Sequence, residues 1–120
     1  MITIEFAKQF SENWTKDWNS HNLEKILSHY SDDFSIESPL ALKRLPETKG
    51  IVIGKDNVRK YWTIGLESNP NLHFKIIDLL IGVNSITIYY LNTTTGKRST
   101  ELMTFDSNKK VIKAIVNYSE

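Results

Sequence analysis

The chain contains no cysteine among its 120 residues. This absence excludes disulfide bonds, thiolate metal sites and catalytic thiol nucleophiles. No apolar run approaches the roughly 20 residues that a membrane-spanning helix requires, so we expect no membrane partner. The first ten residues, MITIEFAKQF, also lack the charged segment and apolar run of a secretory signal. These absences together predict a cytoplasmic protein.

The chain also lacks an excess of charge of either sign. It has 15 lysine and arginine residues against 14 aspartate and glutamate residues, for a net charge of +1. Proteins that bind nucleic acid usually carry a basic face or stripe, so we expect no nucleic-acid partner. The basic pairs lie in segments that we interpret as solvated loops or turns: Lys43/Arg44, Lys97/Arg98 and Lys109/Lys110.

The first half of the chain shows helical periodicity. Residues 3–19 predict an amphipathic helix, and residues 23–30 predict a shorter one that ends at Ser31-Asp32-Asp33. A short strand is expected from Phe34 up to the proline at position 39. A third helix is expected from about residue 56 to 68. The apolar positions of the first helix are Ile4, Ala7, Phe10, Trp14 and Trp18.

Residues 40–54 are interpreted as a long loop, of the kind that often forms a lid or a mouth. After it the period changes to that of strands joined by hairpin-length turns, at residues 72–83, 85–92, 98–106 and 111–119. Residues 76–81 are almost uninterruptedly apolar, so we expect both faces of that strand to be covered. Helices first and strands last predict one α+β domain over residues 1–120, with three helices on one face of a curved antiparallel sheet.

Three segments carry a resemblance to a known family. They are WNSHNLEKILSHYSDDFSIESPL, the later helix GKDNVRKYW, and the closing strands ITIYY, ELMTFD and VIKAIVNY. The chain resembles the nuclear transport factor 2-like superfamily, and within it the SnoaL-like and ketosteroid-isomerase-like small bacterial proteins. The resemblance implies a cone-shaped, cystatin-like fold with a deep apolar cavity, and a homodimer formed through the outer face of the sheet.

The catalytic residues of the isomerases can be compared with this chain one position at a time. Their general-base aspartate lies in a Glu-Asp-Pro motif, which corresponds here to Glu37-Ser38-Pro39. Ser38 therefore holds the position of the base, and a serine hydroxyl cannot remove a carbon-bound proton at neutral pH. Their oxyanion-donating tyrosine corresponds to Trp14, and their late-strand aspartate corresponds to Glu101. Only one carboxyl group is retained, so steroid isomerisation is not expected.

Three residues are candidates for catalysis. Strand alternation places Glu101 on the same face as Met103 and Phe105, so this carboxyl group lies either in the cavity with a raised pKa or at the wet rim of the sheet. Ser38 holds the inward position at a strand end, although a surface position before a proline turn is equally compatible. His73, at the start of the first long strand, is a candidate for the mouth of the cavity.

The chain is rich in aromatic residues at helical and strand spacing, which are usually core residues. Buried indole and phenol groups nevertheless need polar partners, so these residues can also line a ligand cavity. We expect no metal site, because no two histidines have ligand spacing on one element, and we expect no cofactor. The candidate substrate-binding residues are Trp14, Trp18, Tyr30, Phe34, Trp62, Met103 and Tyr118.

Two hypotheses for function follow. The first is a SnoaL-like protein that binds a small, mostly apolar molecule, with cofactor-independent isomerase, cyclase or hydratase chemistry on a carbonyl compound if it is an enzyme. The second is a non-catalytic dimerisation or partner-docking module, suggested by the outward positions Leu102 and Ile115 and by the apolar excess of residues 76–81. An exposed apolar patch on the sheet would favour the second hypothesis.

Overall fold

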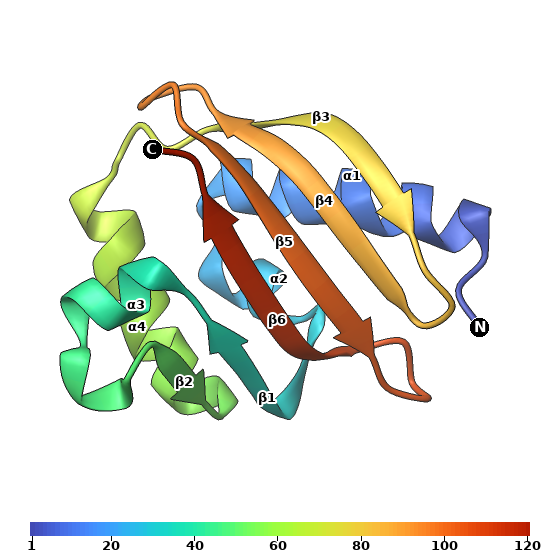
Figure 1. The fold of residues 1–120 in the computed structure, drawn as a ribbon, viewed down its shortest axis with the longest axis horizontal. Coiled ribbons are helices and arrows are strands. Elements are labelled where there is room, and N and C mark those ends of the chain that lie inside the picture. The colour runs from blue at the N-terminus through green and yellow to red at the C-terminus, as the bar shows by residue number, and fades with distance from the viewer.

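A computed structural model describes all residues from 1 to 120. Figure 1 shows one curved sheet with helices against its inner face and around one end. The helices are α1 (Ile4–Ser20), α2 (Leu23–Leu27), α3 (Pro39–Arg44) and α4 (Lys55–Ser68), with a short 3-10 turn η1 (Pro46–Thr48). The strands are β1 (Tyr30–Glu37), β2 (Ile51–Ile53), β3 (Phe74–Ile81), β4 (Ser85–Asn92), β5 (Arg98–Phe105) and β6 (Val111–Tyr118).

The six strands lie in the order β2-β1-β6-β5-β4-β3. The last four form the antiparallel meander that the hairpin-length turns predict. The expectation of a wholly antiparallel sheet was wrong, because β1 pairs in parallel with β6 and then antiparallel with β2. The α+β class and the curved sheet covered by helices are as the sequence predicts.

Helix α1 runs along the inner face of the meander (Figure 1). The Thr3 side chain caps its start by accepting a hydrogen bond from the backbone N–H of Phe6 at 3.0 Å. His21 ends the helix in the left-handed conformation, with φ of 61°. The side chain of Asn19 then brackets the backbone of Phe74, accepting at 2.7 Å and donating at 3.0 Å. This pair of bonds fixes the last turn of α1 against the start of β3.

Two parts of the first half differ from the sequence-based expectation. Residues 30–33 do not end a helix but open β1, and a register shift between Tyr30 and Ser35 absorbs the polar Ser-Asp-Asp run. Residues 40–54 are not one loop, because they contain most of α3, then η1 and β2. Ser38 caps α3 by accepting from the N–H of Leu40 at 3.2 Å, and Pro39 occupies the first helical turn, where proline is favoured.

Strand β3 forms one of the two edges of the sheet, opposite β2, and its outer face is not covered by any helix. The side chains of Ile77 and Leu80 are 49% and 54% exposed. The expectation that both faces of residues 76–81 are covered was therefore wrong for the single chain. A β-bulge lies between Ile76 and Asp78. It changes which residues of the strand face inward, so the apolar residues on its two sides do not follow one simple alternation.

A single core of 24 buried hydrophobic residues lies between the helices and the sheet. Phe6, Phe10 and Phe105 meet edge to face at one end of α1, with ring centroids 5.0 to 5.5 Å apart for the two pairs that include Phe105. No helix in the chain is both long enough and apolar enough to cross a membrane. At the other end of α1 the core is not filled, and that region forms the candidate site.

Candidate functional site

Two connected cavities open between the inner face of the sheet and helices α1, α3 and α4. The inner cavity has a volume of about 90 Å³, and eleven of its sixteen lining residues are hydrophobic. The outer cavity has a volume of about 380 Å³ and leads to the surface. Seven residues border both, so the two form one continuous cleft: Leu40, Arg44, Asn69, Leu72, Phe74, Tyr90 and Tyr118.

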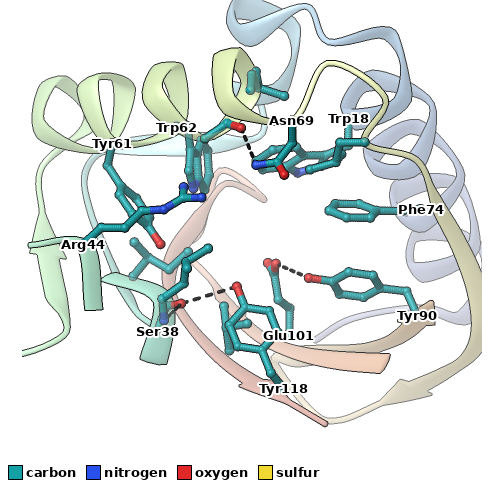
Figure 2. Close-up of a pocket in the computed structure, with 16 residues that line it drawn as sticks. Trp18, Ser38, Arg44, Tyr61, Trp62, Asn69, Phe74, Tyr90, Glu101 and Tyr118 are labelled. Carbon is teal, nitrogen blue, oxygen red and sulfur yellow. Dashed lines mark hydrogen bonds between the residues drawn. The ribbon is translucent and has the colours of Figure 1, made fainter. Parts of the chain in front are cut away.

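Glu101 lies on the inward face of β5 and lines the inner cavity (Figure 2). It is only 5% exposed. The Tyr90 hydroxyl donates a hydrogen bond to Oε1 at 3.0 Å, whereas the buried Oε2 has no partner. Burial raises the pKa of Glu101 to about 7, and the bond from Tyr90 acts in the opposite direction. Near neutral pH this carboxyl group can therefore either accept or donate a proton.

Trp18 supplies a second polar atom without a partner. The indole lies on the last turn of α1 and is 6% exposed, and its buried Nε1 makes no hydrogen bond within 3.5 Å, although Trp18 is near enough to the Tyr30 hydroxyl to act against the burial that raises the pKa of that phenol. Its ring packs edge to face on Trp62 of α4, with centroids 4.9 Å apart. Trp18 and Glu101 both line the inner cavity, and each has a buried side-chain polar atom without a hydrogen bond.

Three hydroxyl groups line another part of the inner cavity: those of Ser38 after β1, Tyr61 on α4 and Tyr118 at the end of β6. The Ser38 hydroxyl donates a long hydrogen bond of 3.4 Å to the Tyr118 hydroxyl. Tyr118 is 42% exposed, but its hydroxyl end lies against Ser38, and burial of that end raises its pKa to about 12. Burial also raises the pKa of Tyr61, against the opposing effects of Ser38 and Arg44. Both phenols therefore remain protonated donors at neutral pH.

The structure divides the ten candidate residues from the sequence into three groups. Glu101, Ser38, Trp18, Trp62 and Tyr118 line the inner cavity. Four lie in the packed core and reach neither cavity: Trp14, Tyr30, Phe34 and Met103. His73 lies outside the site, on the exposed approach to β3, and its Nδ1 contacts the Thr93 hydroxyl at 3.4 Å.

The reasons for these differences are local. Trp14 is 0% exposed, and its indole N–H already donates to the Tyr30 hydroxyl at 3.0 Å. This buried pair satisfies itself, so Trp14 has no donor to offer a ligand. His73 precedes Phe74, whose side chain is buried, and alternation turns the histidine outward.

Sequence reasoning did not assign site roles to Tyr61, Tyr90 and Arg44. Tyr90 could have been found, because the hairpin register pairs Ile88 with Glu101 and places Tyr90 two residues along the same face. Tyr61 lies on the buried face of α4, where a helical pattern predicts a core residue, although it also lines the inner cavity. Arg44 was interpreted as a loop charge, because α3 was not predicted.

No three histidine, aspartate or glutamate side chains are grouped closely enough to hold a metal ion. Glu101 carries the one carboxyl group that lines the inner cavity, whose other polar lining residues are Ser38, Arg44, Asn69 and the tyrosines. The arrangement is suited to binding a small molecule and to moving one proton on it.

Comparison with known proteins places this arrangement in a family. The model of the SnoaL-like domain matches residues 11–111. The chain belongs to the SnoaL-like domain family. A SnoaL-like protein of unknown function from Burkholderia thailandensis is 38% identical, with a TM-score of 0.94 over 100% of both chains. A search of curated proteins gives no match to this SnoaL-like chain.

More distant solved structures share the fold of this SnoaL-like protein. A nuclear transport factor 2-like protein of unknown function from Cytophaga hutchinsonii is 10% identical, with a TM-score of 0.69 over 99% of this chain and 92% of its own. SalBIII, described as an epoxide hydrolase/cyclase-like enzyme with a role in pyran ring formation in the polyether salinomycin, is 14% identical. Its TM-score is 0.73 over 96% of this chain and 92% of its own.

Proposed function

We propose that this SnoaL-like protein binds a small, mostly apolar carbonyl compound in the cleft and acts on it as a cofactor-independent isomerase or cyclase, with Glu101 as the acid/base. One observation carries the proposal: Glu101, whose buried Oε2 has no hydrogen-bond partner, lines a cavity. Leaving a buried carboxylate oxygen unsatisfied costs about 1–3 kcal/mol. A ligand group that hydrogen-bonds to this oxygen would remove that cost.

The chemistry follows from the protonation state of Glu101. As a carboxylate it removes a proton from the carbon next to the ligand's carbonyl group, and the electron pair of that C–H bond forms the enolate. The Nε1–H of Trp18, which also lacks a partner, donates to the enolate oxygen. The protonated Glu101 then returns the proton to another carbon of the ligand. Where the enolate carbon instead attacks a second carbonyl group of the ligand and closes a ring, the C=O electron pair moves to that oxygen, which takes the proton from Glu101. A pKa of about 7 suits both directions of transfer.

The fold neighbours support this reaction class without assigning it. SalBIII, which shares the fold, is described as epoxide hydrolase/cyclase-like. Ring closure requires proton movement between two groups of one substrate, and a single titratable side chain in an apolar cavity can provide it.

The proposal is tested with 2-tetralone, an apolar ketone with exchangeable protons beside its carbonyl group. Proton NMR in D2O measures how fast these protons are replaced by deuterium. We expect the wild-type protein to accelerate exchange, with a rate that rises as the pH passes through about 7 and Glu101 ionises. Glu101→Gln should abolish the acceleration.

Glu37→Gln is the matched control, because Glu37 is an exposed carboxylate on β1 near the same end of the sheet. It should leave the exchange rate unchanged. Equal exchange with Glu101→Gln and with the wild type would overturn the assignment of the acid/base. No exchange and no thermal stabilisation by 2-tetralone or other apolar ketones would overturn the binding claim as well.

The second candidate function is homodimerisation or partner docking through the outer face of the sheet. The strand register aligns Leu80, Thr87, Leu102 and Ile115 in one row across β3 to β6. Leu80 and Leu102 are 54% and 38% exposed. An apolar row of this kind is favourable to bury against a second copy of the chain.

Sedimentation velocity at micromolar concentration tests the dimer. We expect Leu102→Lys to shift the population to monomer, because a charge would be buried in the contact. Ile53→Lys is the control, since Ile53 is 65% exposed but lies on β2, outside the row. A wild-type monomer would remove this candidate and leave the cleft unaffected.

A further inference from the structure

Arg44 is a charged side chain without a partner at the junction of the two cavities. It lies at the end of α3, is half-buried, and lines both the inner and the outer cavity. Figure 2 shows its guanidinium reaching into the cleft beside Tyr61 and Trp62. Arg44 takes part in none of the four ion pairs and in no side-chain hydrogen bond of the protein. A partly desolvated guanidinium without an anion is unfavourable, so its place suggests that the anion comes from a ligand.

Two further cations border the outer cavity. Lys43 comes from α3, and Lys97 precedes β5. Neither takes part in an ion pair, and no aspartate or glutamate lines this cavity. We call Lys43, Arg44 and Lys97 the cationic rim. Cations at the end of α3 also complement its helix dipole, but Lys97 lies on another element and does not share that explanation.

Gly65 of α4 makes room for the guanidinium. A Cβ built at this position would lie 3.2 Å from Nη1 of Arg44, and nothing else comes within 4 Å of it. Gly65 lies in the interior of a 14-residue helix, where glycine is less favourable than alanine by roughly 0.5–1 kcal/mol. The contact with Arg44 is thus the one packing reason for glycine here that the structure offers. Its backbone carbonyl also accepts from Asn69 Nδ2 at 2.8 Å, which holds the adjacent wall of the cleft.

The sizes of the cavities set the length of the ligand. The inner cavity, at about 90 Å³, holds a small group, whereas ligand pockets for whole small molecules are usually several times larger. A ligand whose reactive group reaches Glu101 must therefore extend past Arg44 into the outer cavity. The distal end of such a ligand then lies beside the positive charges of the cationic rim.

We propose that the ligand of this cleft is an organic anion: an apolar molecule whose carbonyl end enters the inner cavity and whose carboxylate or phosphate group is bound by Arg44, with Lys43 and Lys97 beside it. Arginine matches either group through two parallel N–H···O bonds. This inference rests on the proposed function of the cleft and specifies the class of its ligand.

Three matched probes test the charge requirement: 4-phenylbutanoate, 4-phenylbutyl phosphate and the neutral 4-phenylbutan-1-ol. Quenching of tryptophan fluorescence reports binding, because Trp18 and Trp62 line the inner cavity. We expect at least one anion to bind about tenfold more tightly than the alcohol at low salt, with the preference reduced in 0.5 M NaCl. The stronger of the two anions identifies the distal group.

Arg44→Met should remove most of the preference for the anion over the alcohol, with Lys43 and Lys97 supplying what is left. Arg98→Met is the matched control, because it removes the same charge from the outer side of the sheet, where Arg98 Nη1 donates to the Tyr89 hydroxyl at 3.0 Å. It should preserve the preference. Gly65→Ala keeps the charge but places a methyl group 3.2 Å from Nη1, so the guanidinium must shift slightly and anion binding should weaken by less than in Arg44→Met.

Equal binding of the anions and the alcohol by the wild type would overturn the inference while leaving the cleft as a ligand site. A preference that is undiminished in Arg44→Met, or that is lost equally in Arg98→Met, would also overturn it. Failure of all three probes to bind would count against the cleft itself, and therefore against both proposals.

Discussion

Two tryptophans one turn apart on α1 occupy opposite environments. Trp14 is 0% exposed, stacks on Phe74 at an interplanar angle of 17°, and donates its N–H to the Tyr30 hydroxyl. Trp18 is 6% exposed, lines the inner cavity, and leaves its N–H without a partner. The same residue type on the same face of one helix completes the core in one case and borders a hollow in the other.

This difference extends along the whole interior. Around the first half of α1 the rings of Phe6, Phe10 and Phe105 fill the space between helix and sheet. Around its last turn, two buried polar atoms remain unsatisfied and a guanidinium lacks an anion. Protein interiors are normally close-packed, and their polar groups are normally paired. The exceptions gather in one half of the molecule, which is where we place its function.

The strongest test replaces each tryptophan with alanine. Trp14→Ala should lower the free energy of unfolding by roughly 4 kcal/mol or more, because it opens a core cavity and leaves the Tyr30 hydroxyl unpaired. Trp18→Ala should cost roughly 2 kcal/mol less, since its N–H has no partner to lose and its ring already borders a cavity. Urea unfolding with unchanged m-values measures both. Equal losses would contradict the distinction between a packed half and a hollow half.

The periodicity of the sequence was sufficient to predict which residues share a face where an element is regular. It placed Glu101 on the same face as Met103 and Phe105 because β5 alternates without interruption, and it left open whether Glu101 lies in the cavity or at the wet rim of the sheet. It failed for residues 40–54, because Pro39 was interpreted as the end of a strand and not also as the first residue of α3. The parallel pairing of β1 with β6 also escaped prediction, since Ile36 and Ala114 are distant in sequence and no local signal joins them.

The site was only partly predictable for a related reason. Trp14 and Trp18 are equivalent in a helical pattern, because both fall on the apolar face. Which of them borders a cavity depends on the side chains opposite, and Tyr30 meets Trp14 while the cleft meets Trp18. Arg44 depended on α3, a helix of only six residues for which periodicity gives little signal. Patterns thus predict the direction of a side chain and not the packing that it meets.

A second test uses pH to sharpen the contrast. The pKa of Glu101 is about 7 in the folded protein and near its ordinary value of 4.5 when unfolded. Between these values the folded state binds a proton that the unfolded state does not, so stability falls as the pH rises through this window and stays low above it. The loss between pH 4 and pH 8 amounts to roughly 3 kcal/mol from this group.

Glu101→Gln removes this titration. We expect the variant to be about as stable as the wild type at pH 4 and more stable by roughly 3 kcal/mol at pH 8. Thermal or urea unfolding across this range measures the difference. The matched Glu37→Gln variant should follow the wild-type profile, because Glu37 is exposed. Parallel profiles for Glu101→Gln and the wild type would show that the carboxyl group is not buried in the folded state.

The smallest expected effect concerns the one bond that Glu101 does make. The Tyr90 hydroxyl donates to Oε1 and so lowers the pKa of Glu101 against the effect of burial. Tyr90→Phe should therefore move that pKa above about 7 and reduce stability at pH 8 by roughly 1 kcal/mol. Titration of the Glu101 carboxyl carbon by NMR measures the shift.

Tyr89→Phe is the matched control. The Tyr89 hydroxyl accepts from Arg98 on the outer side of the sheet, so this variant should leave the titration of Glu101 unchanged. A Glu101 pKa that stays constant or falls in Tyr90→Phe would mean that the Tyr90 hydrogen bond does not stabilise the ionised form of Glu101.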